Sequence, residues 1–164
     1  MKVPPGRLLA IAALGSLCLA AGVAAAPTKP WERLKDQASI LEVNHHYSQS
    51  IELYKQALRL VPAADELCRL QILCALADCY KKVLDGENTC AVLDQIEVLA
   101  KTMQTNGKLG MEAQFSLGFL LDDLDRGLPY VSPGGDARKR LKASRLIQGH
   151  VLKLTRSVMP GRLT

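Results

Sequence analysis

The histidines are the first candidates for chemistry in this chain of 164 residues. His45 and His46 are adjacent and could ligate a metal or act as a base, whereas His150 stands far along the chain without an obvious partner. Catalysis and metal binding need several reactive groups that converge on one point. We therefore favour a capping role for His45 and His46, in a turn between two helices, over a metal-binding or catalytic one.

Two further stretches look like ligand-binding motifs without meeting their requirements. Asp122, Asp123 and Asp125 lie in "LDDLDRG", which lacks the ligand spacing of a calcium-binding loop. Residues 132–136, "SPGGD", are rich in glycine but lack the lysine of a phosphate-binding loop. The sequence also has no GxSxG motif for a serine nucleophile. We therefore expect a protein that is not an enzyme and that has no cofactor and no metal.

The first 26 residues form a separate segment. Lys2 and Arg7 give it a positive start, and the chain is then uncharged from Leu8 to Ala26, where it ends in small residues. This layout is typical of a secretory signal peptide, so we expect cleavage after Ala25 and an exported protein, periplasmic or secreted. The alternative is an uncleaved membrane anchor at residues 8–26, which are just long enough to span a bilayer. Their Ala and Gly content makes them weakly hydrophobic and favours cleavage.

Export would leave four cysteines in an oxidising compartment, namely Cys68, Cys74, Cys79 and Cys90. An even number permits disulfides. The first three share one expected helix at offsets too long to bridge, so only Cys79 and Cys90, on either side of a hairpin loop, are expected to pair. The alternative is that all four are small buried residues in helix cores.

Composition and periodicity predict an all-α fold. The chain is 48% hydrophobic but only 4% aromatic, and it is rich in the helix formers Ala and Leu. Apolar residues recur at helical spacing in segments that are separated by Pro62, "DGEN" and "TNGKLG". We expect six helices in short-looped pairs, at about residues 31–43, 45–61, 65–84, 88–105, 111–125 and 136–158.

Small, aromatic and leucine residues recur at fixed offsets in these segments. They are Tyr47, Ser50, Tyr54, Ala57, Pro62, Leu73, Leu76, Ala77, Tyr80, Leu117 and Gly118. The pattern resembles the tetratricopeptide repeat family, in which small residues let paired helices approach and aromatics fill the space between neighbouring pairs. The units here are longer than the family's 34 or so residues. His45 also stands where the family usually has glycine.

The resemblance implies a short right-handed solenoid of about three antiparallel helix pairs over residues 27–133. It implies that the first helix of each pair lines a concave groove. The groove residues would be Lys35, Asp36, Ser39, Glu42, Gln71, Cys74, Asp78, Lys81, Lys82, Phe115, Phe119, Asp122 and Asp123. Such a mixed-charge groove suits a peptide or protein partner. Family members that bind chaperone tails clamp a terminal carboxylate, but Ala75 and Ser39 replace their asparagines, so we do not expect that ligand.

Charge divides the chain in two. Residues 27–133 carry eleven basic and fifteen acidic side chains, whereas residues 134–164 carry eight basic and one acidic. This basic C-terminal helix, expected to close the stack, either contacts an anionic surface or is a solvated face partly neutralised by nearby aspartates. Export and the lack of aromatics for base stacking argue against nucleic acid.

Two functional hypotheses follow from these features. The first is an exported scaffold that binds a peptide or protein in the groove. The alternative is a structural module at an anionic membrane surface, held by the basic C-terminal helix or by the uncleaved leader. The oligomeric state stays open.

Overall fold

The computed structural model describes residues 29–126 and 137–159, and all regular structure in these ranges is helical. The helices are α1 (Pro30–Val43), α2 (Tyr47–Leu60), α3 (Glu66–Lys82), α4 (Gly86–Thr105), α5 (Met111–Asp125) and α6 (Ala137–Val158). The expected all-α class is therefore confirmed. The leader at residues 1–26, the glycine-rich stretch at 132–136 and Arg162 lie outside the described residues. Within the described ranges, no helix has the length and apolar character needed to cross a membrane.

Side-chain caps set where two of the helices begin. The Asp65 side chain accepts a hydrogen bond from the backbone N–H of Cys68 at 3.3 Å, which is the cap expected for α3. Asp85 does the same for the backbone N–H of Asn88 at 3.1 Å. Because Asp85 is the cap, α4 begins at Gly86 and not near Asn88 as expected.

The turn between α1 and α2 contains the two histidines. His45 has φ 62°, in the left-handed region that glycine adopts most easily. Its Nδ1 lies 2.8 Å from the Tyr47 hydroxyl. His46 immediately precedes α2, but its ring makes no capping hydrogen bond. The histidines therefore lie at the turn as expected, without capping the helix through their side chains.

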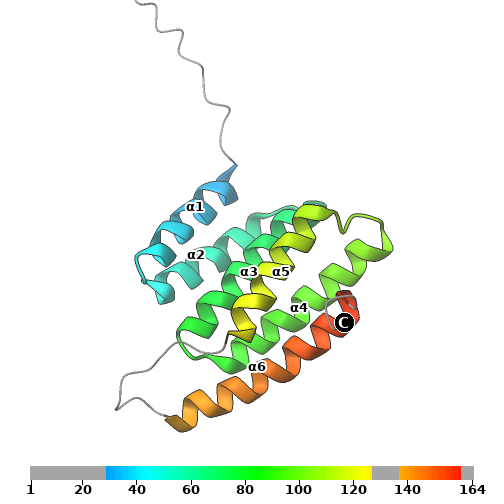
Figure 1. Cartoon of the computed structure of the whole chain (residues 1–164). Helices are drawn as coiled ribbons and strands as arrows, with labels where there is room; N and C mark the ends of the chain where they lie inside the picture. Colours follow the sequence, from blue (N-terminus) through cyan, green and yellow to red (C-terminus); the bar gives the residue numbers. More distant parts are fainter. Residues whose placement is uncertain (1–28, 127–136, 160–164) are drawn as a thin grey trace, which may run out of the picture.

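The helices pack in a defined order along the chain (Figure 1). The α1 helix packs on α2, and α3 contacts α2, α4 and α5. The α6 helix lies along α4 and makes a smaller contact with α5. Most of the residues that carry the repeat resemblance are buried, namely Ser50, Tyr54, Ala57, Leu73, Leu76, Ala77, Tyr80 and Leu117. Tyr47 and Gly118 are partly exposed and Pro62 is exposed.

Small residues let neighbouring helices approach closely at two places. Ser50 in α2 is fully buried and donates from Oγ to the carbonyl oxygen of Ala38 in α1 at 2.8 Å. At the contact between α4 and α6, a Cβ built on Gly86 in α4 would lie 2.8 Å from the Cα of Ala143 in α6. No side chain fits at Gly86 unless α4 and α6 move apart.

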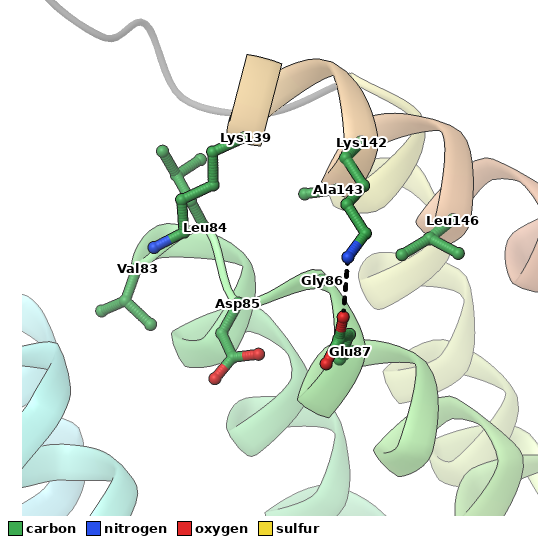
Figure 2. A pocket seen from close by; sticks show the side chains of 9 residues that line it. All are labelled: Val83, Leu84, Asp85, Gly86, Glu87, Lys139, Lys142, Ala143 and Leu146. Atoms are coloured by element: carbon green, nitrogen blue, oxygen red, sulfur yellow. Dashed lines mark hydrogen bonds and ion pairs between the residues drawn. The ribbon is translucent and has the colours of Figure 1, made fainter. Parts of the chain in front are cut away.

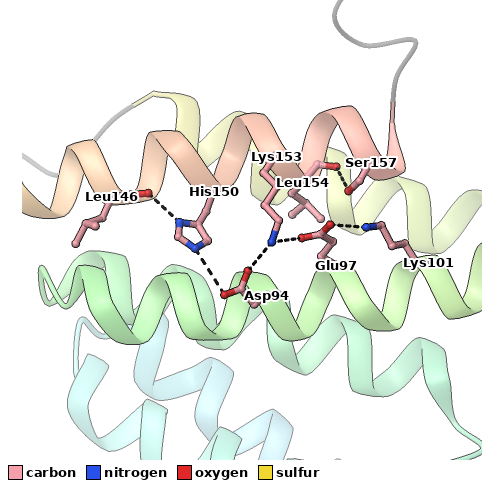
Figure 3. Close-up of polar contacts among 8 residues, drawn as sticks. All are labelled: Asp94, Glu97, Lys101, Leu146, His150, Lys153, Leu154 and Ser157. Carbon is pink, nitrogen blue, oxygen red and sulfur yellow. Dashed lines mark hydrogen bonds and ion pairs between the residues drawn. The ribbon is translucent and has the colours of Figure 1, made fainter.

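Ion pairs join α6 to α4 along one edge of the molecule (Figure 3). Lys153 Nζ lies 3.1 Å from Asp94 Oδ1 and 2.9 Å from Glu97 Oε2. Glu97 also accepts from Lys101 at 2.5 Å. His150, expected to have no partner, lies with Nε2 3.6 Å from Asp94 Oδ2. Part of the positive charge of the C-terminal helix is thus balanced by acidic residues of α4.

The apolar side of α6 is part of the core. Its buried apolar side chains are Ala143, Ile147, Val151, Leu154 and Val158. Leu141 lies on another side of the helix and is 52% exposed. The reason is rotation about the helix axis, since Leu141 is two residues from Ala143 and helical neighbours at that spacing do not share a face.

The cysteines do not form the expected disulfide. Cys68, Cys74, Cys79 and Cys90 are all free and all buried. Cys79 turns toward α2, where its Sγ lies 3.6 Å from Ser50 Oγ, instead of toward the α3–α4 turn. Burial raises the pKa of the Cys74 and Cys79 thiols to about 12, so the reactive thiolate is scarce at neutral pH. The four residues act as small core side chains.

Candidate functional site

A pocket of about 270 Å³ lies between α1, α3 and α5. It is lined by Glu42, Gln71, Cys74, Ala75, Asp78, Phe115, Ser116, Phe119, Leu120 and Asp123. We call it the α1/α3/α5 pocket. The structure thus brings together seven residues that the sequence placed on a groove, namely Glu42, Gln71, Cys74, Asp78, Phe115, Phe119 and Asp123.

Both phenylalanines of the chain stand at this pocket. The Phe115 side chain is 74% exposed and that of Phe119 is 68% exposed. They lie one turn apart on α5, and Met111, which is 86% exposed, continues the same stripe one turn earlier. Large aromatic side chains gain most from burial, so an exposed aromatic stripe beside a pocket is typical of an interaction surface.

The charged residues that line the pocket are Glu42, Asp78 and Asp123, and all three are carboxylates. Among the described residues, no protein donor is hydrogen-bonded to the buried Oδ1 of Asp78, and Lys82 Nζ is 3.7 Å from it. Burial and the neighbouring Asp123 raise the pKa of Asp78 to about 7. Asp78 therefore keeps its proton over a pH range in which an exposed aspartate is ionised.

Lys81 is a correction to the expected groove. We expected its ammonium group to face a partner, but the side chain is only 3% exposed. Its Nζ donates to the backbone carbonyl oxygen of Asp123 and, at 2.6 Å, to Asp123 Oδ2. Burial raises the pKa of Asp123, but hydrogen bonds from Asp78 and Lys81 outweigh it and bring that pKa below its usual value. Lys81 thus holds α3 to α5 behind the pocket.

Two other hydrogen bonds tie the pocket to the fold. Tyr54 in α2 donates from its hydroxyl to Glu42 Oε2 at 2.8 Å, which fixes the α1 carboxylate at the pocket edge. Gln71 Nε2 donates to Glu112 Oε1 at 2.9 Å and links α3 to the first turn of α5. The first of these hydrogen bonds is half-buried and the second is exposed, and together they link pocket residues of α1 and α3 to α2 and α5.

Several expected groove residues lie outside the pocket. Lys35, Asp36 and Ser39 stand earlier along α1 than Glu42, and the pocket reaches α1 only near its C-terminal end. Asp122 is exposed on α5 but does not line the pocket, and Lys82 is held near Asp78 and Asp123. The sequence analysis missed Ala75, Ser116 and Leu120 as lining residues. The signal that could have found them is helical spacing, since Ala75 is four residues from Gln71, Ser116 is three from Phe119 and Leu120 is three from Asp123.

A second pocket, of about 350 Å³, lies at the turn between α3 and α4 under the start of α6 (Figure 2). Its polar groups already serve the fold. Lys142 of α6 pairs with Glu87 of α4 at 2.9 Å. The Asp85 carboxylate accepts from the backbone and side-chain nitrogens of Asn88 at 3.1 and 2.7 Å. We therefore regard this pocket as the seam where α6 joins α4.

Metal-binding side chains do not converge in the part of the chain that the structure describes. No group of three or more His, Cys, Asp and Glu side chains there could hold a metal ion. His150 Nδ1 lies 3.1 Å from the Leu146 carbonyl oxygen on its own helix, far along the chain from His45 and His46. The α1/α3/α5 pocket places apolar and acidic groups side by side.

Comparisons with known proteins identified no relative of this chain. The chain matches no protein-family model, no curated protein and no solved structure. The resemblance to the tetratricopeptide repeat family therefore rests on the residues named above and stays a prediction, as does the signal peptide.

Proposed function

We propose that this protein is an interaction scaffold that holds a peptide segment of another protein in the α1/α3/α5 pocket. Its three helix pairs then form a short right-handed solenoid of the tetratricopeptide type, with α1, α3 and α5 on the concave side. The observation that carries the proposal is the exposure of both phenylalanines beside a pocket lined only by these three helices. The protein would do this work after export, once residues 1–25 are removed.

The energetics of interfaces favour this assignment. A few anchors, mostly aromatic or arginine, supply most of the binding energy when a partner buries them. Phe115 and Phe119 lose little by facing solvent in the free protein, because α5 is already anchored by Leu117, Leu121 and Leu124 on its other side. A partner can therefore bury both aromatic side chains without disturbing the packing of the fold.

The test is capture of a partner by the purified protein and by the double variant Phe115→Ala and Phe119→Ala. We expect the double variant to stay folded and to bind more weakly by about 1–3 kcal/mol, the range for interface anchors. Val98→Ala is the matched control, because Val98 is 68% exposed on α4 and lies outside the pocket. Equal capture by the double variant and the wild type would contradict the proposal.

A second candidate is a module at an anionic membrane surface. The outer face of α6 favours it, because Leu141 and Leu152 are 52% and 50% exposed among basic residues. Against it, Lys142 and Lys153 are engaged with acids of α4. Binding to vesicles that contain phosphatidylserine, lost when Arg138, Arg140 and Arg145 are all changed to Glu, would favour this candidate.

A further inference from the structure

We infer that the α1/α3/α5 pocket selects partner segments in which an arginine or lysine side chain stands next to a large apolar residue. This inference rests on the proposed function and adds the chemical class of the partner. Three features of the pocket carry it, namely its charge, its open acceptor and its aromatic edge.

The charge of the pocket has one sign. Glu42 from α1, Asp78 from α3 and Asp123 from α5 converge on it, and no lysine or arginine is among its described lining residues. The nearby cations Lys81 and Lys82 approach Asp123 and Asp78 from α3. Lys81 is buried behind the pocket, whereas Lys82 is 28% exposed and offsets part of the charge on Asp78 and Asp123, so an incoming ligand meets three carboxylates and one partly exposed lysine. A cationic side chain complements this arrangement, and an acidic one or a terminal carboxylate is repelled.

Asp78 supplies an acceptor that forms an ion pair with Lys82 at 3.7 Å but makes no hydrogen bond within the described fold. Its Oδ1 is buried and no donor in the described part of the chain is hydrogen-bonded to it. Burial and Asp123 raise the pKa of Asp78, so the Asp78 carboxyl group of the free protein keeps its proton to a higher pH than an exposed aspartate does. A guanidinium or ammonium group at Oδ1 would supply the missing donor and favour the ionised carboxylate.

The aromatic edge fits the same ligand. A guanidinium or ammonium group is attracted to the face of an aromatic ring, and guanidinium also stacks on it. Phe115 and Phe119 are exposed beside the carboxylates, and their rings can also cover the methylene stem of the side chain or an adjacent apolar residue. The volume of about 270 Å³ is slightly below the range of sites for whole small molecules, roughly 300–1,000 Å³. It suits one long side chain of a peptide.

The test is selection of peptides from a random display library on the purified protein. We expect the selected peptides to be enriched in Arg or Lys adjacent to Phe, Leu, Ile, Met or Trp. Replacing the selected Arg or Lys by Gln in a synthetic copy should weaken binding at least tenfold. The isosteric variants Asp78→Asn and Glu42→Gln should each weaken binding at least threefold. Glu52→Gln, on the exposed face of α2, is the matched control and should leave binding unchanged.

The outcomes separate this inference from the proposed function. Peptides that depend on Phe115 and Phe119 but show no preference for Arg or Lys would overturn the inference and leave the proposed function standing. Peptides indifferent to both phenylalanines, or no selected peptide, would overturn both. A third outcome is that no peptide is selected and that the protein self-associates in a way that Arg145→Glu abolishes. The occupant of the pocket would then be α6 of a second copy, and the assignment to a segment of another protein would be overturned.

Discussion

At the residue scale, Asp78 shows how one side chain can weaken the fold and prepare a binding site. Its carboxylate is largely buried beside Asp123, with Glu42 also near and only Lys82 to offset them. Burial without a close hydrogen-bond donor disfavours the charged form of a carboxyl group. The native state therefore binds a proton at Asp78 more tightly than the unfolded chain does.

This predicts a specific pH dependence of stability. The pKa of Asp78 is about 7 in the folded protein and near 4 in the unfolded chain, so the free energy of unfolding should fall as the pH rises from 4 to 7. Asp78→Asn removes this titration and should stabilise the protein at pH 8 by on the order of 1–2 kcal/mol. Urea unfolding at pH 4.5, 6 and 8 measures the effect. The exposed Asp125→Asn is the control, and a parallel pH profile for Asp78→Asn and the wild type would contradict the prediction.

At the element scale, the contact between α4 and α6 depends on a glycine, which has no side chain, and on a set of ion pairs. Gly86 brings the first turn of α4 against Ala143 of α6 (Figure 2). Glu97 and Asp94 hold the later turns of the two helices together through Lys153 (Figure 3). Each feature can be tested by one substitution with an internal control.

Gly86→Ala should destabilise the protein although alanine is the better helix former. Its Cβ would lie 2.8 Å from the Cα and 2.9 Å from the Cβ of Ala143, so α4 and α6 must separate, at a cost of about 1–3 kcal/mol. Gly149→Ala is the matched control, because nothing lies within 4 Å of its Cβ position in the middle of α6. There the gain in helix propensity should stabilise by about 0.5–1 kcal/mol. Thermal midpoints that move in the same direction for both variants would rule out the close contact at Gly86.

Glu97→Gln should remove a contribution to the free energy of unfolding that depends on pH. Hydrogen bonds from Lys101 and Lys153 lower the pKa of Glu97 to about 2, below its unfolded value near 4.3. Its contribution is therefore complete above pH 4.5 and is lost as the pH falls toward 2. The two lysines are 52% and 59% exposed, so solvent screening limits the effect to about 1 kcal/mol at pH 7. We expect the unfolding free energies of the variant and the wild type to converge between pH 4.5 and 2, and a constant gap would argue against the pairing.

At the scale of the whole molecule, the basic α6 helix is part of the folded unit. It buries one side against α4 and α5 while its basic residues face outward or pair with α4. The large side chains buried from α6 are Ile147, Val151, Leu154 and Val158. At about 1.5–3 kcal/mol each, their burial is worth roughly 6–12 kcal/mol, which is close to the whole stability of a typical domain.

Removal of residues 127–164 should therefore abolish cooperative unfolding. We expect the shortened chain to bind a hydrophobic dye and to lose its sharp thermal transition, because the faces of α4 and α5 against α6 become exposed. The full-length variant with Arg138, Arg140 and Arg145 changed to Glu controls for the loss of charge and should keep its transition. A shortened chain as cooperative as the full protein would mean that α6 is an appendage.

The sequence predicted the elements well because their signals are local. Pro62 ended α2 and Asp65 capped α3 as expected, since both effects act within a few residues of the chain. It also predicted Phe115 and Phe119 on a groove, and both are exposed beside the α1/α3/α5 pocket, although an apolar helix such as α5 gave no means of separating exposed from buried sides. The exposure of a side chain depends on which neighbouring helices cover each side of its helix. The spacing of apolar residues within one helix does not determine this.

The sequence by itself determined the all-α class, the six helices and the concentration of positive charge in the last one, because propensity, caps and charge are properties of short segments. Only the tertiary structure decided that Lys81 turns inward to Asp123, that Cys79 faces Ser50 instead of Cys90, and that carboxylates of α1, α3 and α5 meet in one pocket. These outcomes depend on the rotation of each helix about its axis and on which helices become neighbours. Both are set by packing among residues far apart in the chain.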